Sequence, residues 1–173
     1  MLPKLTFVLG GASSGKSAFA ENLVMQSGAP RVYIATSQAF DDEMTAKIDA
    51  HILARGPDWH TIEAPTDASA ALAQVETGQI VLFDCATMWL SNQMLAQADI
   101  ATETQSLVAA LRACKGRVVI VSNEVGMGVV PDNSLARQFR DAQGKLNQHL
   151  AGISDLAVFV VAGQPLVLKG TLG

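Results

Sequence analysis

The fold is decided by residues 5–17, LTFVLGGASSGKS. The first five of these residues form an apolar run typical of a buried β-strand, and residues 10–17 match the pattern GxxxxGK[ST]. A helix-like segment, residues 16–26, begins inside the motif. A strand, a glycine-rich loop and a helix in this order form the context that makes the motif specific. The sequence therefore predicts a phosphate-binding loop, or P-loop.

The chemistry of phosphate binding needs these residue types. Glycines let the backbone curl until successive N–H groups point at phosphate oxygens, and the start of the helix adds a partial positive charge. Lys16 can reach the β- and γ-phosphates, and the Ser17 hydroxyl can ligate Mg²⁺. The expected nucleotide-binding residues are Gly10, Gly11, Ala12, Ser13, Ser14, Gly15, Lys16 and Ser17.

The rest of the chain alternates short apolar runs with helix-like segments. Further strands are expected at residues 31–35, 80–83, 118–121 and 156–162, and helices at 41–55, 67–76, 102–113 and 134–153. The runs show little alternation, which suits strands buried on both faces of a parallel sheet. The pattern predicts one α/β domain over residues 1–173, with helices flanking a mostly parallel sheet and an antiparallel edge strand at 166–168.

A P-loop enzyme also needs an acidic residue on the metal side of the phosphates. Asp84 directly follows the apolar run 80–83, so it lies at the carboxyl end of a predicted strand, where ligands bind in open α/β sheets. This position predicts that Asp84 and Ser17 hold Mg²⁺. Asp84 can alternatively serve as a cap for the segment that follows it.

Composition narrows the function classes. The formal net charge is −4 and there is no basic block, so sequence-independent nucleic-acid binding is not expected. The apolar runs are too short to span a bilayer, so no integral membrane segment is expected. The two cysteines, Cys85 and Cys114, lack metal-site spacing and suit buried thiols in a reducing cytoplasm.

A histidine in the predicted helix 41–55 shares one face with two cations. Lys47, His51 and Arg55 are spaced at i, i+4 and i+8. Neutral imidazole is a good nucleophile near pH 7, and flanking cations would stabilise charge that develops on an attacked phosphate. The alternative is a structural histidine on a helix surface. The pattern alone leaves both interpretations open.

Taken together, the motifs resemble the bifunctional adenosylcobinamide kinase/adenosylcobinamide-phosphate guanylyltransferase family of cobalamin biosynthesis. The resemblance covers nearly the whole chain, in order. The matching stretches are GGASSGKSAFAE (10–21), YIATSQAFDDEM (33–44), HILARGPDWHTIE (51–63), VLFDCATMWLSN (81–92), NEVGMGVVPDNSLARQFRDAQGKLNQHLA (123–151) and VVAGQPLVLKG (160–170).

The resemblance implies a RecA-like P-loop domain and two reactions. In the first, adenosylcobinamide is phosphorylated with ATP or GTP, and in the second, GMP is transferred from GTP to that phosphate through a guanylyl-histidine at His51. Mg²⁺ accompanies the nucleotides, and a cytoplasmic homotrimer is expected. Besides the P-loop residues, the implied GTP contacts are Ala35, Thr36, Ser37, Ile52, Leu53, Ala54, Arg55, Glu63 and Cys85.

One position departs from the family pattern. The family's loop usually has arginine where this chain has Ser13, so one cation near the phosphates is missing, and Lys47 and Arg55 are candidates to compensate. Two other functions stay open at this point: a small-molecule kinase in which His51 only binds phosphate, and a RecA-like nucleotide-switch module.

The predicted strand 118–121 is followed by a glycine-containing stretch before the long C-terminal helix. Gly126 and Gly128 make this stretch permissive and Pro131 stiffens its exit, which suits a lid or a loop that contacts the corrinoid. A structural crossover is the alternative interpretation.

Overall fold

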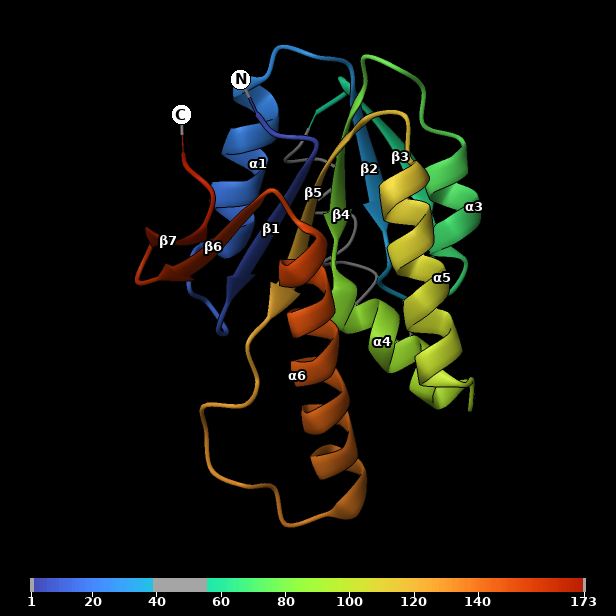
Figure 1. Cartoon of the computed structure of the whole chain (residues 1–173), viewed down its shortest axis with the longest axis vertical. Coiled ribbons are helices and arrows are strands. Elements are labelled where there is room, and N and C mark those ends of the chain that lie inside the picture. The colour runs from blue at the N-terminus through green and yellow to red at the C-terminus, as the bar shows by residue number, and fades with distance from the viewer. Residues whose placement is uncertain (1, 39–55, 173) are drawn as a thin grey trace.

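The computed structural model describes residues 2–38 and 56–172, and its centre is one seven-stranded sheet (Figure 1). The strand order is β3-β2-β4-β5-β1-β6-β7, and all neighbours are parallel except the last pair. The strands are β1 (Leu5–Gly10), β2 (Arg31–Ala35), β3 (Trp59–Glu63), β4 (Ile80–Asp84), β5 (Arg117–Asn123), β6 (Leu156–Val161) and β7 (Gln164–Lys169).

The five apolar runs predicted as strands are confirmed, and they form the inner part of the sheet. Side chains on both faces of these strands are buried, as the lack of alternation indicates. The predicted edge strand at 166–168 is also confirmed as part of β7, which pairs antiparallel with β6. Every residue of β7 is exposed, so β7 forms the outer edge.

The described helices are α1 (Lys16–Gln26), α3 (Ala68–Ala73), α4 (Ala86–Leu95), α5 (Ile100–Ala113) and α6 (Ser134–Ile153). Four of them lie where the sequence predicts helices. The predicted helix at 41–55 falls outside the described residues. Among the described helices, none combines the length and apolar character needed to cross a membrane.

Strand β3 and the full extent of helix α4 were not predicted. Among the described strands β3 pairs with β2 alone, and three of its five residues are exposed, so it lacks an apolar run. Helix α4 is buried on most of its surface, so its sequence shows no clear amphipathic period. Both elements depend on tertiary contacts for their burial.

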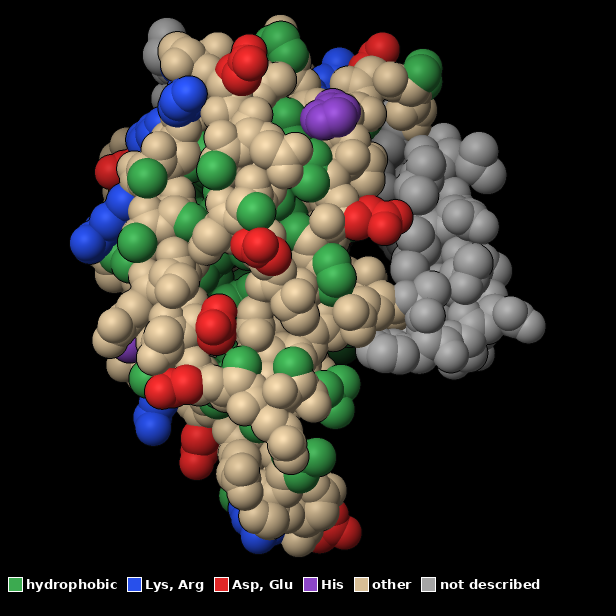
Figure 2. All heavy atoms as spheres, turned by 90° about the vertical axis from the view of Figure 1, so that its right-hand side faces the viewer, with side chains coloured by type: hydrophobic (Ala, Val, Ile, Leu, Met, Phe, Trp, Pro, Cys, Tyr) green, Lys and Arg blue, Asp and Glu red, His purple; other side chains and the backbone are tan. Residues whose placement is uncertain are grey.

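Helices cover both faces of the sheet. Helix α1 packs against β1, β4, β5 and β6 on one face, with Ala20 and Val24 in that core. Helices α3, α4, α5 and α6 enclose the second core on the opposite face, which includes the buried ring of Trp89. Acidic and apolar side chains are dispersed over the face that carries α3 and α5, with a few basic side chains near its margins (Figure 2).

The parallel strands place their carboxyl ends along one edge, which we call the C-terminal edge (Figure 1). Strand β5 lies between β1 and β4, so the P-loop after β1 and Asp84 at the end of β4 flank the end of β5. The segment between β5 and α6 projects beyond this edge (Figure 1). The topology therefore gathers the predicted site residues of β1, β2, β3 and β4 at the C-terminal edge.

Candidate nucleotide site

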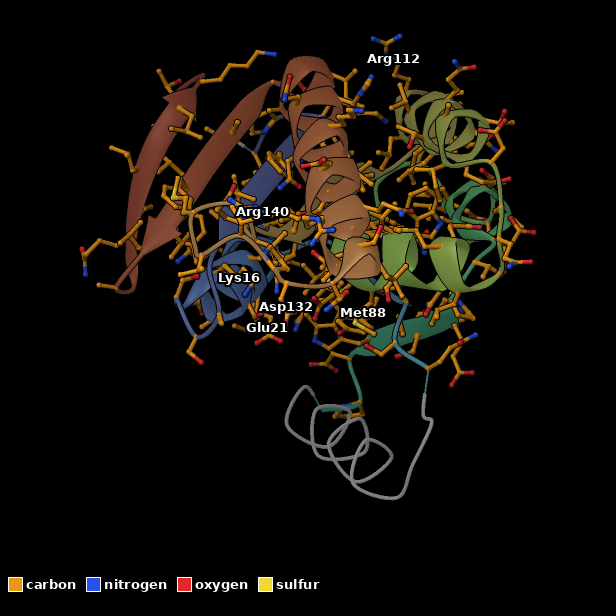
Figure 3. The ribbon with its side chains drawn as sticks, turned by 90° about the horizontal axis from the view of Figure 1, so that it is seen from below. Lys16, Glu21, Met88, Arg112, Asp132 and Arg140 are labelled. Atoms are coloured by element: carbon orange, nitrogen blue, oxygen red, sulfur yellow. The ribbon has the colours of Figure 1, made fainter. Side chains whose placement is uncertain are left out.

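The P-loop joins β1 to α1 through a tight backbone curl. The Ser14 N–H donates to the Gly11 carbonyl (3.3 Å), and Gly15 precedes α1 with φ of 91°, a conformation that favours glycine. The Lys16 ammonium donates to the Gly11 carbonyl at 3.0 Å, so this cation lies over the loop. Seen from the C-terminal edge, Lys16 lies on the β1–α1 side, and Met88 comes from the start of α4 (Figure 3). The predicted strand–loop–helix context of the motif is confirmed.

Gly10 is required by close packing. A Cβ at this position would meet the Ser14 Oγ atom and would lie 2.9 Å from the Val160 carbonyl oxygen. At Gly11, a Cβ would meet no atom of the described residues within 4 Å, so close packing explains Gly10 and does not explain Gly11. The loop also rests on the turn between β6 and β7, because the Gly163 N–H donates to the Ser14 carbonyl (2.8 Å).

Asp84 ends β4 with its carboxylate oriented by an aromatic hydroxyl. The Tyr33 hydroxyl donates to Asp84 Oδ2 at 2.8 Å from the neighbouring strand β2. Ser17 lies exposed in the first turn of α1. These two residues therefore come from opposite sides of the end of β5, as a phosphate and metal site between them would require.

The donor set suits Mg²⁺. A hydroxyl and a carboxylate are hard oxygen ligands, and Mg²⁺ in nucleotide sites takes most of its other ligands from phosphates and water. Within residues 2–38 and 56–172, no group of three or more His, Cys, Asp or Glu side chains forms a dedicated metal cage. The residues thus fit a cation that arrives with a nucleotide.

Cys85 follows Asp84 through a cis peptide bond and is the N-cap of α4. Its Sγ atom accepts from the Met88 N–H at 3.5 Å. Burial, and then the negative charge of Asp84, raise the pKa of the Cys85 thiol from its ordinary 9.0 to about 11. Cys85 is therefore a neutral thiol near pH 7, and Cys114 is a second free thiol, buried at the C-terminal end of α5.

The predicted contacts on β2 and β3 lie side by side. Ala35 and Glu63 are register partners at the ends of these strands, and Ser37 and Glu63 are exposed there. Thr36, by contrast, is fully buried. The structure therefore brings these residues to the same edge as the P-loop and Asp84, while only some of them present side chains to solvent.

The remaining predicted site residues fall outside the described part of the chain. They are the proposed nucleophile and its neighbours, His51, Ile52, Leu53, Ala54 and Arg55, together with Lys47. Their roles stay predictions.

Sequence reasoning missed a buried polar cluster behind the end of β5. The Ser122 hydroxyl donates to Asn147 Oδ1 (2.7 Å) and accepts from Gln143 Nε2 (2.9 Å), both from α6. Thr87 of α4 accepts from the Asn123 N–H at 2.8 Å. The available signal was the i, i+4 pair of amide side chains at 143 and 147, next to the apolar positions of α6.

Comparison with known proteins supports a specific family. The model of the cobinamide kinase/cobinamide phosphate guanyltransferase family matches residues 6–168. The bifunctional adenosylcobalamin biosynthesis protein CobP of Pseudomonas aeruginosa is 42% identical over 94% of this chain and 96% of its own length. CobU proteins of the same description from Escherichia coli and Salmonella typhimurium are 40% and 41% identical, each over 95% of this chain and 99% of their own length.

Solved structures are similar at the level of the fold. A Pyrococcus horikoshii protein, PH0250, is 10% identical with a TM-score of 0.55, covering 98% of this chain and 87% of its own. An ATPase of a bacterial type III secretion system is 11% identical with a TM-score of 0.51, covering 90% of this chain and 50% of its own. The predicted RecA-like P-loop fold is confirmed. The match to the family model, together with the relatives described above, shows that the chain belongs to the cobinamide kinase/cobinamide phosphate guanyltransferase family.

Proposed function

We propose that this chain phosphorylates adenosylcobinamide with ATP or GTP and then transfers GMP from GTP to the new phosphate. In the transfer, His51 carries the guanylyl group covalently after it leaves GTP and before it reaches the corrinoid phosphate. The observation that carries the proposal is a P-loop facing a strand-end aspartate in a chain that the family model matches over residues 6–168. Family membership makes the chain a kinase and a guanylyltransferase, and the covalent step at His51 is proposed from the resemblance of the sequence to that family.

In the kinase step, the substrate hydroxyl oxygen attacks the γ-phosphorus, and the bond from that phosphorus to the β–γ bridging oxygen breaks. The P-loop N–H groups and Lys16 hold the phosphates and balance the charge that develops on them. Ser17 and Asp84 would hold Mg²⁺, which would neutralise a further part of that charge. Asp84 and Glu124, both at the C-terminal edge, are the candidates that we name to accept the hydroxyl proton.

In the transfer step, a neutral imidazole nitrogen of His51 attacks the α-phosphorus of GTP. The bond from that phosphorus to the α–β bridging oxygen breaks, and pyrophosphate leaves. A phosphate oxygen of the corrinoid then attacks the same phosphorus, the P–N bond breaks, and the imidazole is restored. Adenosylcobinamide-GDP is the product. Two easier displacements thus replace one direct transfer.

GTP labelled at the α-phosphate tests this mechanism. Wild-type protein is expected to form an acid-labile, base-stable adduct that adenosylcobinamide phosphate discharges. His51→Ala is expected to lose the adduct and GMP transfer while retaining phosphorylation of the corrinoid. The matched control is His149→Ala, since His149 is exposed on α6. A wild-type protein that transfers GMP without forming an adduct would refute the covalent histidine step.

We also propose that residues 124–133, the β5–α6 loop, contact the corrinoid. The loop starts beside the P-loop, because the Glu124 N–H donates to the Gly10 carbonyl at 3.0 Å. It exposes Met127, Val129 and Val130, with 79%, 95% and 65% of their surfaces accessible. An apolar surface next to the phosphates suits a large, partly apolar acceptor better than it suits a nucleotide.

The β5–α6 loop is held from α6 by two arginines. Arg140 donates to the Gly126 carbonyl, and Arg137 donates to the carbonyls of Pro131 (2.9 Å) and Asp132 (2.8 Å).

Val129→Ser is expected to raise the KM for adenosylcobinamide about 3- to 10-fold with the KM for GTP unchanged. Leu168→Ser on exposed β7 is the control. An unchanged corrinoid KM in Val129→Ser would refute this role.

The resemblance further suggests a cytoplasmic homotrimer, which we propose as the working state. Light scattering on the purified protein should then give three times the chain mass of 18.2 kDa. A mass of one or two chains under assay conditions would contradict the trimer.

A further inference from the structure

Thr36 is a buried junction between the ends of β2 and β4. Its side chain has no exposed surface. Its hydroxyl donates to the Cys85 carbonyl (2.8 Å) and accepts from the Cys85 N–H (2.7 Å). Its own N–H donates to the Asp84 carbonyl at 3.2 Å. Thr36 thereby fixes the end of β2 against the residue pair that carries the proposed metal ligand.

Asn92 of α4 completes the junction by linking it to the segment after β3. Its Nδ2 donates to the Thr36 carbonyl at 2.8 Å and to the Pro65 carbonyl at 2.9 Å. Asn92 is 3% exposed, and its Oδ1 is buried without a partner among the described residues. Because only a group with two N–H bonds can donate to two carbonyls, neither leucine nor aspartate can replace this amide.

Helix α4 also holds the segment after β3. The Trp89 ring N–H and Gln93 Nε2 both donate to the Thr66 carbonyl, at 3.0 and 2.8 Å. The Ala64 N–H donates to the Ala35 carbonyl at 2.8 Å. The ends of β2, β3 and β4 are therefore fastened to one another and to α4, and Thr36 and Asn92 are the two residues that bridge all of them.

We infer that Thr36 and Asn92 are positioning residues of the nucleotide site, which set Ser37 and Glu63 relative to Asp84. Every hydrogen-bonding group of Thr36 already has a protein partner, so Thr36 acts through its neighbours and does not bind GTP itself. The inference rests on the proposed function, because the proposed function places GTP at the C-terminal edge, where Ser37 and Glu63 are exposed.

The P-loop lies on a different part of the sheet. Strand β1 pairs with β5 and β6, and the hydrogen bonds that Thr36 and Asn92 make within the described residues do not reach residues 10–17. A disturbance of the junction is therefore expected to shift Ser37 and Glu63 while the phosphate loop keeps its shape. The result is weaker and misplaced GTP in a protein that still binds phosphates.

Thr36→Val tests the inference, because valine keeps the shape and removes the hydroxyl. A small misplacement at a reacting centre can cost about 100-fold, so we expect kcat/KM for labelling by α-labelled GTP to fall about 10- to 100-fold per folded molecule. The Kd for GTP should rise at least about tenfold, and Thr36→Ser should restore both values to within about threefold. Pyrophosphate binding should stay unchanged.

Thr6→Val is the matched control. Thr6 is fully buried in β1, and its hydroxyl has no partner among the described residues. This variant should label and bind GTP like wild type. Asn92→Leu is the second test variant and should reproduce the defect of Thr36→Val. The double variant should lose less than the product of the two single losses, because both side chains hold the same segment: the Thr36 hydroxyl bonds to Cys85, and Asn92 donates to the Thr36 main-chain carbonyl.

The outcomes separate the inference from the proposed function. If wild type forms no adduct, the proposed function fails, and the junction is then judged by GTP affinity in the same variants. Wild-type GTP affinity and labelling in folded Thr36→Val and Asn92→Leu would overturn the inference. A loss that Thr36→Ser does not restore, or one equal in Thr6→Val, would overturn it as well.

Discussion

The acidity of Cys85 gives a prediction whose size follows from the structure. The thiol is withdrawn from water and lies next to the carboxylate of Asp84, and both effects disfavour the thiolate. Alkylation by iodoacetamide proceeds through the thiolate, so its pH dependence reports the pKa. We expect the alkylation rate of Cys85 to keep rising with pH past 9.0 toward a midpoint near 11.

The expected magnitude is large. At about pH 8, a thiol of pKa 9.0 is about 10% ionised and one of pKa about 11 only about 0.1%, a loss of about 100-fold in thiolate. A more basic thiolate is also the better nucleophile, by about tenfold over this interval, so the net decrease in rate is about tenfold. The midpoint is the sharper quantity, because steric shielding lowers the rate without moving it.

The assay follows Cys85 by mass spectrometry in a Cys114→Ser background, with circular dichroism at each pH to establish that the protein is folded. Asp84→Asn removes the second cause of the shift, so its midpoint should fall while staying above 9.0 because burial persists. GTP should slow alkylation if Cys85 contacts the nucleotide. A rate that levels off near pH 9 in the folded protein would refute the reasoning.

Three further outcomes are expected at the same edge. Gly10→Ala should lower the free energy of unfolding by about 1–3 kcal/mol through overpacking. Gly11→Ala should change the melting temperature little, because its Cβ would meet no atom of the described residues, and equal melting temperatures for the two variants would contradict the packing account. Ser13→Arg, which restores the family's cation, should lower the KM for ATP in the kinase assay by up to about tenfold, and a higher KM would argue that the loop has no room for it. Tyr33→Phe removes the hydroxyl that orients Asp84 and should raise the Mg²⁺ concentration needed for half-maximal activity about 3- to 10-fold; an unchanged Mg²⁺ dependence would show that the hydroxyl does not matter.

Much of the fold was predictable because its signals are local. Apolar runs without alternation indicate strands buried on both faces, and β1, β2, β4, β5 and β6 lie where such runs occur. The P-loop was equally readable, since glycines, a lysine and a serine at fixed spacing form a phosphate site with few alternatives. Strand β3 was missed because an edge strand with exposed side chains has no such run.

The sequence by itself determined the phosphate loop, the strand-end aspartate and the family, because each depends on residues close together in the chain or on their order. Only the tertiary structure decided which residues around them act at a distance. Thr36 and Asn92 are 56 positions apart, and no spacing rule connects them. Their hydrogen bond exists because the parallel sheet brings the end of β2 next to the end of β4, and α4, which starts directly after β4, carries Asn92 to the end of β2.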